Sequence, residues 1–166
     1  MIREATIHDL ERLTEIYNQA ILSKKATADT ETFTAEQRRE WLLSHNNKRT
    51  PLLVYEDCGT VLGYCYLSEY RPGRRALESI AEISYYIDFD YHRRGIASKL
   101  IQSIIDAAIA LEYRNLLAIL LSCNHGSIAL LEKHGFKLWG TLPDVVRIDA
   151  DVYSHFYYGL NIEAKK

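Results

Sequence analysis

The chain has 166 residues, of which 48% are hydrophobic and 25% are charged. This length suits one domain with a sizeable core, and the composition excludes an intrinsically disordered chain. Twenty Lys and Arg against 22 Asp and Glu give a net charge of −2. The chain as a whole therefore has no field that attracts nucleic acid or a membrane surface, and any anion site must be local.

Three cysteines, Cys58, Cys65 and Cys123, are spread along the chain without close pairs or zinc-ligand spacing. This pattern predicts reduced thiols that pack rather than react, and no metal site. The chain begins without the apolar segment of a signal peptide, so we expect a cytoplasmic protein. The strongest apolar run, Leu116 to Leu121, is far shorter than the roughly 20 residues of a membrane helix.

The first part of the chain predicts a strand and two helices. Ile2 to Ala5 is strand-like, and apolar residues then recur at three- and four-residue steps from Ile7 to Ile21, which indicates an amphipathic helix. A polar loop, Ser23 to Phe33, follows. Thr34-Ala35-Glu36-Gln37 has the form of a capping box and opens a second helix.

The middle of the chain predicts a hairpin, a long strand and a long helix. Leu52 to Glu56 and Val61 to Ser68 flank a good hairpin turn, Asp57-Cys58-Gly59-Thr60. A basic loop over residues 70–75 precedes the strand Ile80 to Phe89. The helix runs from Ile96 to Leu111.

The end of the chain predicts a buried strand, a short helix and two last strands. The apolar strand runs from Leu116 to Ser122, and the helix from Ser127 to His134 ends at Gly135 as a left-handed cap. The last strands are Phe136 to Thr141 and Tyr153 to Leu160.

This order of elements predicts the fold class. Antiparallel hairpins at both ends and a crossover helix in the middle favour an α+β (mixed α/β) fold, with a mixed, mostly antiparallel sheet flanked by helices. We expect residues 1–166 to form a single domain.

The hexapeptide His92-Arg93-Arg94-Gly95-Ile96-Ala97 lies between the long strand and the long helix. A helix start has unpaired backbone N–H groups and a partial positive charge, and the small residues let an anion approach them. The two arginines add charge and forked donors. The segment indicates a phosphate or pyrophosphate site, although a short turn with solvated arginines is the alternative.

In this context the chain resembles the GNAT superfamily of acyl-CoA-dependent N-acetyltransferases, whose pyrophosphate loop reads [Arg/Gln]-x-x-Gly-x-[Gly/Ala]. His92 stands where Arg or Gln is usual. Asn124-His125-Gly126-Ser127 and Leu131-Glu132-Lys133-His134-Gly135-Phe136 fit two further family segments. The resemblance implies the GNAT fold and acetyl-CoA as the cofactor.

Within the superfamily the chain resembles the branch of phosphinothricin and methionine sulfone/sulfoximine N-acetyltransferases. Four segments carry this similarity, namely Thr27 to Glu31, Trp41, Ala81 to Ile87, and Gly135 through Leu142. The resemblance implies acetylation of the amino group of a small amino acid or analogue by direct transfer. It also implies a homodimer.

The resemblance also assigns the cofactor-binding residues. Backbone groups of the central strand are expected to bind pantetheine, the loop to bind the pyrophosphate, and three residues near the last helix to complete the site. These residues are Ser84, Tyr85, Tyr86, Ile87, His92, Arg93, Arg94, Gly95, Ile96, Ala97, Asn124, Ser127 and Lys133. Alternatively, Tyr85 and Tyr86 are plain strand aromatics that face opposite sides of the sheet.

Two residues are candidates for the chemistry. Glu82 matches the catalytic Glu of the branch and would assist deprotonation of the amine, while the alternative is a strand-edge carboxylate in a salt bridge. Many GNAT enzymes place a general-acid Tyr where this chain has Leu131. Tyr153 in the last strand is the candidate substitute, and packing or substrate binding is the alternative.

Four residues are candidates for binding the acceptor. Thr30, Glu31 and Arg74 match acceptor-side segments of the branch, and Arg75 follows Arg74 in the loop before the central strand. The arginines suit the carboxylate of an amino acid. Three other functions remain open, namely a non-catalytic acyl-CoA-binding or sensing module and an acetyltransferase for a peptide N-terminus or for a polyamine.

Overall fold

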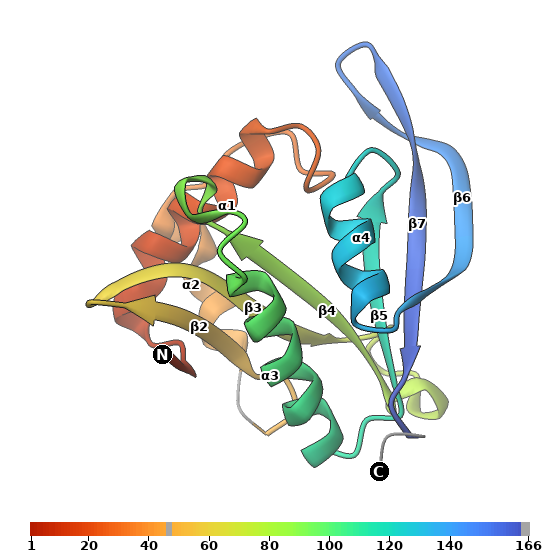
Figure 1. Ribbon diagram of the computed structural model, residues 1–166, viewed down its shortest axis with the longest axis horizontal. Coiled ribbons are helices and arrows are strands. Elements are labelled where there is room, and N and C mark those ends of the chain that lie inside the picture. The colour runs from red at the N-terminus through yellow and green to blue at the C-terminus, as the bar shows by residue number, and fades with distance from the viewer. Residues whose placement is uncertain (46–47, 164–166) are drawn as a thin grey trace.

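The computed structural model describes residues 1–45 and 48–163 and contains one seven-stranded sheet with the strand order β1-β2-β3-β4-β5-β7-β6 (Figure 1). The expected α+β fold is confirmed. The strands are β1 (Ile2–Glu4), β2 (Leu52–Asp57), β3 (Thr60–Glu69), β4 (Ile80–Ile87), β5 (Asn115–Leu121), β6 (Lys137–Ile148) and β7 (Asp151–Asn161). The helices are α1 (Leu10–Leu22), α2 (Ala35–Ser44), α3 (Ile96–Ala110) and α4 (His125–Lys133).

The helices cover the two faces of the sheet in pairs. On the first face, α1 and α2 pack on β2 and β3 through residues such as Leu13, Leu42 and Tyr64. On the second face, α3 and α4 enclose the larger core, which includes Leu100 and Leu131 and which lies toward the viewer in Figure 1. Successive strand residues alternate between these two cores, as the pleat of a strand requires.

The centre of the sheet opens where β4 and β5, the one parallel pair among the described strands, diverge. β4 and β5 are paired over three positions, from Ile80↔Asn115 to Glu82↔Leu117, and every other pair of neighbouring strands is antiparallel. Beyond Glu82 the two strands separate, and Figure 1 shows them spreading apart. The edge of β4 from Ile83 onward therefore has no strand partner on the β5 side.

Two local sequence signals are confirmed in detail. The Thr34 hydroxyl accepts a hydrogen bond from the Gln37 N–H at 3.3 Å, and the Gln37 side chain accepts one from the Thr34 N–H at 2.8 Å, which completes the capping box. In the β2–β3 turn, Cys58 and Gly59 both have positive φ, 46° and 78°, as the favoured two-residue hairpin requires. Cys58 is consequently exposed, so the expectation that it packs in the interior is wrong.

Three predicted boundaries are corrected. β4 ends at Ile87 rather than Phe89, because the Asp88 carboxylate accepts a hydrogen bond from the Asp90 N–H at 2.9 Å and starts a 3-10 turn. β6 continues to Ile148 rather than Thr141, because the ladder shifts register between Leu142 and Val146 and so tolerates the turn-forming residues in between. α4 begins at His125, two residues earlier than predicted.

Within residues 1–45 and 48–163, no helix is long and apolar enough to cross a membrane. The same residues contain no group of three or more His, Cys, Asp or Glu side chains that could hold a metal ion. All three cysteines are free thiols.

Candidate active site

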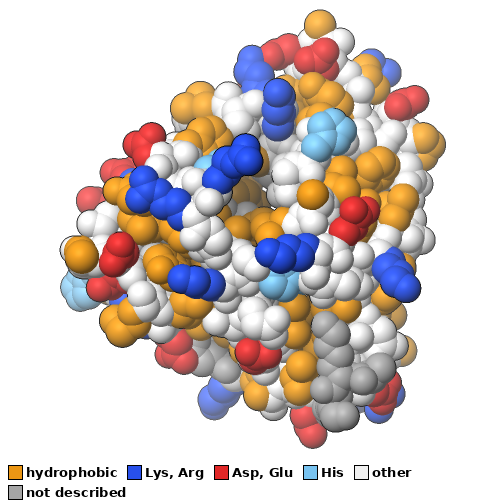
Figure 2. All heavy atoms as spheres, in the orientation of Figure 1, with side chains coloured by type: hydrophobic (Ala, Val, Ile, Leu, Met, Phe, Trp, Pro, Cys, Tyr) orange, Lys and Arg blue, Asp and Glu red, His pale blue; other side chains and the backbone are white. Residues whose placement is uncertain are grey.

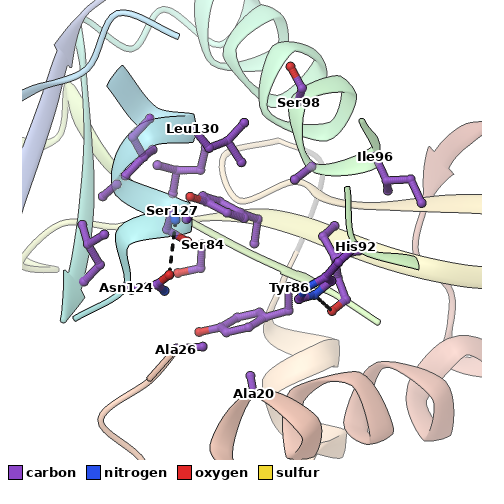
Figure 3. Close-up of a pocket in the computed structure, with 18 of the residues that line it drawn as sticks. Ala20, Ala26, Ser84, Tyr86, His92, Ile96, Ser98, Asn124, Ser127 and Leu130 are labelled. Atoms are coloured by element: carbon purple, nitrogen blue, oxygen red, sulfur yellow. Dashed lines mark hydrogen bonds between the residues drawn. The ribbon is translucent and has the colours of Figure 1, made fainter. Parts of the chain in front are cut away.

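A cavity of about 480 Å³ occupies the opening between β4 and β5 (Figure 3). Its walls come from β4, the loop before α3, the first turn of α3, β5, α4, and the end of α1 with the loop that follows it. Twelve of the thirteen predicted cofactor-binding residues line this one cavity: Ser84, Tyr85, Tyr86, Ile87, His92, Arg93, Gly95, Ile96, Ala97, Asn124, Ser127 and Lys133. Segments more than forty residues apart in sequence therefore meet at one site.

Arg94 is the predicted cofactor-binding residue that does not line the cavity. Its guanidinium lies over the Tyr91 ring, 4.8 Å from the centroid, and donates a hydrogen bond to the Asp90 carbonyl at 3.4 Å. Arg94 therefore braces the loop from outside, and Arg93 is the arginine of the pair that faces the cavity.

The loop before α3 exposes the start of that helix to the cavity. Gly95 is the N-cap of α3 and has a φ of +76°, a left-handed conformation that glycine adopts without strain. The N–H groups that follow it have no carbonyl in a preceding turn to bond. Figure 2 shows Lys and Arg side chains bordering a hollow on this side of the molecule. The arrangement favours an anion.

His92 has a structural role in this loop. One of its ring nitrogens lies 3.0 Å from the Ile87 carbonyl oxygen, and the ring packs on Phe89 with the centroids 4.9 Å apart. The side chain thus ties the loop to the end of β4.

The same loop is anchored to α1 by an ion pair. The Arg12 guanidinium pairs with the buried Asp88 carboxylate, and the Gln19 side chain accepts a hydrogen bond from the Phe89 N–H at 2.9 Å. Burial alone would raise the pKa of Asp88, but the Asp90 N–H and Arg12 outweigh it and hold the pKa below its usual value. Asp88 is therefore charged, and its ion pair with Arg12 holds the loop against α1.

Replacing Asp88 by Asn is expected to destabilise the fold by about 1–3 kcal/mol at pH 7, because it leaves Arg12 without its buried partner. Because the folded pKa of Asp88 is lowered, its contribution is present above the unfolded value of about 3.9 and is lost as the pH falls through the folded pKa. Urea unfolding between pH 7 and pH 3 measures this difference.

The matched control for this change is Glu15→Gln, which removes the exposed second partner of Arg12. We expect an effect of about 0.5 kcal/mol or less, as is usual for surface ion pairs. Equal losses in the two variants, or a difference that does not shrink at low pH, would contradict the anchoring role of Asp88.

Glu82 lies on β4 at the point where the strands separate. It is opposite Ser68 on β3, and Ser84 and Tyr86 follow it on the first face of the sheet. Burial raises the pKa of Glu82. Burial is the only influence on that pKa, with no hydrogen bond or ion pair from the described residues, so the structure does not support the alternative of a salt-bridged strand carboxylate. Ser84, its neighbour on that face, lines the cavity.

Tyr85 and Tyr86 face opposite sides of the sheet, as predicted. The Tyr86 ring lies 4.8 Å from that of Tyr17 and 5.4 Å from that of Tyr64 on the first face. Tyr85 packs against the core of the second face. Both nevertheless line the cavity, because the cavity passes through the opening in the sheet.

Glu82 and the remaining predicted site residues lie outside the residues that line this cavity. The Tyr153 hydroxyl donates a hydrogen bond to Asp151 at 3.2 Å, and the side chain is partly exposed. Arg74 and Arg75 line a second cavity of about 320 Å³ beside the start of β4. Thr30 and Glu31 are exposed in the α1–α2 loop.

Several cavity residues were not identified from the sequence. They share small or apolar side chains: Ala20, Ala26, Ile83, Ala118, Ile119, Leu120, Gly126 and Leu130. The sequence contained part of the information needed to find them, since the β5 residues form a continuous apolar run. That run predicts a buried strand, but only the divergence from β4 turns it into the wall of a cavity.

Comparison with known proteins agrees with this geometry. Residues 2–156 match the acetyltransferase (GNAT) domain. The chain therefore belongs to the GNAT family of acetyltransferases, and the expected superfamily is confirmed.

Three similar proteins illustrate the relationship. A Bacillus subtilis protein provisionally named a phosphinothricin acetyltransferase is 39% identical over 153 residues, which cover 92% of this chain and 93% of that protein. An L-methionine sulfoximine/L-methionine sulfone acetyltransferase of Pseudomonas paraeruginosa is 30% identical over 145 residues, with 87% and 84% coverage. A crystal structure of a Sinorhizobium meliloti phosphinothricin acetyltransferase with acetyl-CoA superposes with a TM-score of 0.91 at 25% identity, covering 97% and 87% of the two chains.

Proposed function

We propose that this chain transfers the acetyl group of acetyl-CoA to the amino group of a small amino acid or amino-acid analogue, with Glu82 assisting deprotonation. One observation carries this proposal. A single cavity connects the open N-terminus of α3 with the free edge of β4, and Glu82 lies where that free edge begins. The branch of the relatives supports the class of acceptor.

The residues of the cavity fit acetyl-CoA. The start of α3 and Arg93 suit a pyrophosphate, and the unpaired edge of β4 offers backbone groups to an extended amide-containing chain. Asn124 caps α4 by accepting a hydrogen bond from the Ser127 N–H at 3.2 Å, so this helix end is also fixed at the cavity (Figure 3). When bound, acetyl-CoA supplies the acetyl group as a thioester.

Glu82 is suited to accept the proton of the attacking amine. An α-amino group has a pKa of about 8, so most of it is protonated at pH 7 and a base is useful. A carboxylate whose pKa is raised by burial is a better proton acceptor than an exposed one. No partner within the described chain shifts the pKa of the carboxylate, which lies two residues before the cavity-lining Ser84 on the same face of β4.

The second cavity favours an acceptor that carries a negative group. Four arginines, Arg74 and Arg75 among them, line it beside the start of β4, together with two glutamates. A polyamine is a polycation and would be repelled by this excess of positive charge.

A thiol-release screen tests the proposal. The panel contains methionine sulfone, methionine sulfoximine, phosphinothricin and the common amino acids, each paired with its carboxamide to remove the negative group. We expect release with an amino acid and much less with its amide. Binding of CoA without release on any amine would identify a non-catalytic module, and preference for spermidine or a peptide would overturn the acceptor class.

Replacing Arg74 or Arg75 by Gln is expected to raise the KM for the acceptor roughly 10-fold, the loss of one charge-assisted hydrogen bond, with the Kd for acetyl-CoA unchanged. Both arginines line the second cavity rather than the first, so the affinity for the cofactor should not change. Arg39→Gln, at an exposed arginine of α2, is the control. An unchanged KM in both variants would remove these arginines from acceptor binding.

We further propose a cytoplasmic homodimer. β6 is an edge strand and carries exposed apolar side chains, among them Leu138, Trp139 and Leu142. Such an edge is usually covered in the native assembly, and the free thiols suit a reducing compartment. Sedimentation equilibrium that returns the mass of a single chain would contradict the dimer.

A further inference from the structure

The Tyr85 hydroxyl is a buried polar group without a partner. Of all buried side-chain nitrogen and oxygen atoms in the described part of the chain, it is the one that makes no hydrogen bond. Native proteins seldom leave such a group unsatisfied, and an exception calls for an explanation. Because Tyr85 lines the cofactor cavity, a ligand in that cavity can supply the missing acceptor.

The position of this hydroxyl relative to α4 is informative. The Ser127 side chain, in the first turn of α4, lies close enough to lower the Tyr85 pKa, but the two hydroxyls do not have hydrogen-bond geometry. Ser127 and Leu131 are four residues apart on α4 and therefore lie on the same face of the helix, one turn from each other. Leu131 is buried and also lines the cavity. The Tyr85 hydroxyl on β4 therefore lies near the face of α4 that carries Leu131, whose side chain has no polar group.

Other tyrosines near the site are less suitable. Tyr86 packs edge-on against Tyr17 on the first face. The Tyr91 ring is stacked under Arg94, and the Tyr153 hydroxyl bonds Asp151 outside the cavity. Tyr85 therefore combines a hydroxyl that lacks a partner, a position in the cavity and contact with α4.

We propose that the Tyr85 hydroxyl donates a hydrogen bond to the sulfur of the acetyl-CoA thioester as the acetyl group is transferred. This inference rests on the proposed function. In the step, the amine nitrogen forms a bond to the carbonyl carbon, and the carbon–sulfur bond breaks with its electron pair remaining on sulfur. Glu82 takes the proton from nitrogen and passes it to water. Tyr85 keeps its own proton, and the free thiol gains one from water.

The environment of Tyr85 suits a donor that stays protonated. Burial raises the pKa of Tyr85 well above its usual value, and the Ser127 side chain offsets only part of this effect. The hydroxyl consequently remains neutral throughout the working pH range. A neutral donor held at the cavity wall stabilises developing negative charge on sulfur more than it stabilises the neutral thioester.

The decisive experiment measures the thiol pKa of bound CoA. It is obtained from the pH dependence of the ultraviolet absorbance of the thiolate, with the complex of desulfo-CoA subtracted to remove the protein thiols. For Tyr85→Phe we expect the bound thiol pKa to rise by about one unit, kcat to fall roughly 10- to 100-fold, and the Kd for desulfo-CoA to stay within a few-fold.

Two further variants sharpen the test. Tyr55→Phe, on the same face of the sheet but outside the residues that line the cavity, should change neither quantity. Adding Leu131→Tyr to Tyr85→Phe returns a hydroxyl from the helix side and should restore part of the thiol pKa shift, which also keeps the test valid if the single variant is unstable.

An unchanged thiol pKa in Tyr85→Phe would overturn the inference even if activity falls, because the hydroxyl would then not contact sulfur. The outcome is separable from the proposed function. If the wild-type chain acetylates no amine but Tyr85→Phe still raises the bound thiol pKa, the hydrogen bond stands and the acceptor proposal fails.

Discussion

Glu82→Gln is expected to lower kcat by roughly 10²- to 10⁴-fold, the range for loss of a general base, while the Kd for acetyl-CoA stays unchanged. The amide keeps the shape of the side chain but accepts no proton. In the wild-type protein kcat should fall as the pH drops through the raised pKa of Glu82, and this acid limb should be absent from the variant. Stopped assays of thiol release across pH measure both effects.

The same substitution should not weaken the fold. Because burial raises the pKa of Glu82, the folded state binds its proton more tightly than the unfolded state, so the ionised carboxylate costs stability at pH 7. Glu82→Gln is therefore expected to be at least as stable as the wild type in urea at neutral pH. A structural salt bridge would give the opposite sign.

The control for Glu82 is Glu11→Gln, at an exposed carboxylate of α1. We expect wild-type kcat and stability from this variant. If Glu82→Gln retains full turnover, Glu82 is not the base. If it loses acetyl-CoA binding instead, the carboxylate serves the cofactor site rather than the amine.

Gly95→Asp is expected to weaken CoA binding roughly 10- to 100-fold, because it places a negative charge where the pyrophosphate would lie. A Cβ at Gly95 meets no atom within 4 Å, so the new side chain enters open space. Asp tolerates the left-handed conformation better than most residues and is a favoured N-cap beside the positive end of the α3 dipole. The fold should therefore persist while affinity falls, as calorimetry with CoA and a thermal melt would show.

Gly95→Asn is the matched control, since it has the same shape and the same tolerance of positive φ without the charge. We expect only a few-fold loss of affinity for CoA in this variant. Raised salt should reduce the difference in Kd between the Asp and Asn variants, because salt screens the added charge. Equal affinities for the Asp and Asn variants would show that no anion binds at the start of α3.

Much of the fold follows from short segments of sequence. Thr34 and Gln37 form their capping box, and Cys58-Gly59 forms the hairpin turn, because these signals act over three or four residues. The order of strands and helices is also correct, since apolar periodicity is a local property. The predicted end of an element is wrong where a segment distant in sequence determines it. β6 is an example, because pairing with β7 keeps it extended beyond Thr141.

The candidate site divides in the same way. The anion loop around Gly95 is recognisable from sequence because one strand–loop–helix segment contains it. The anchoring of that loop is not, since Arg12 and Asp88 are 76 residues apart. Sequence also proposed Tyr153 as a source of a proton, whereas the structure puts its hydroxyl on Asp151 and brings Tyr85 into the cavity.

By itself, the sequence determined the elements, their order, the caps and turns and the helix start that favours an anion, because each of these depends on neighbours within a few residues. The tertiary structure alone decided where β4 and β5 separate, which face each tyrosine occupies and which buried groups lack a partner. Those properties depend on strand register and on packing between segments far apart in the chain, and no local pattern encodes them.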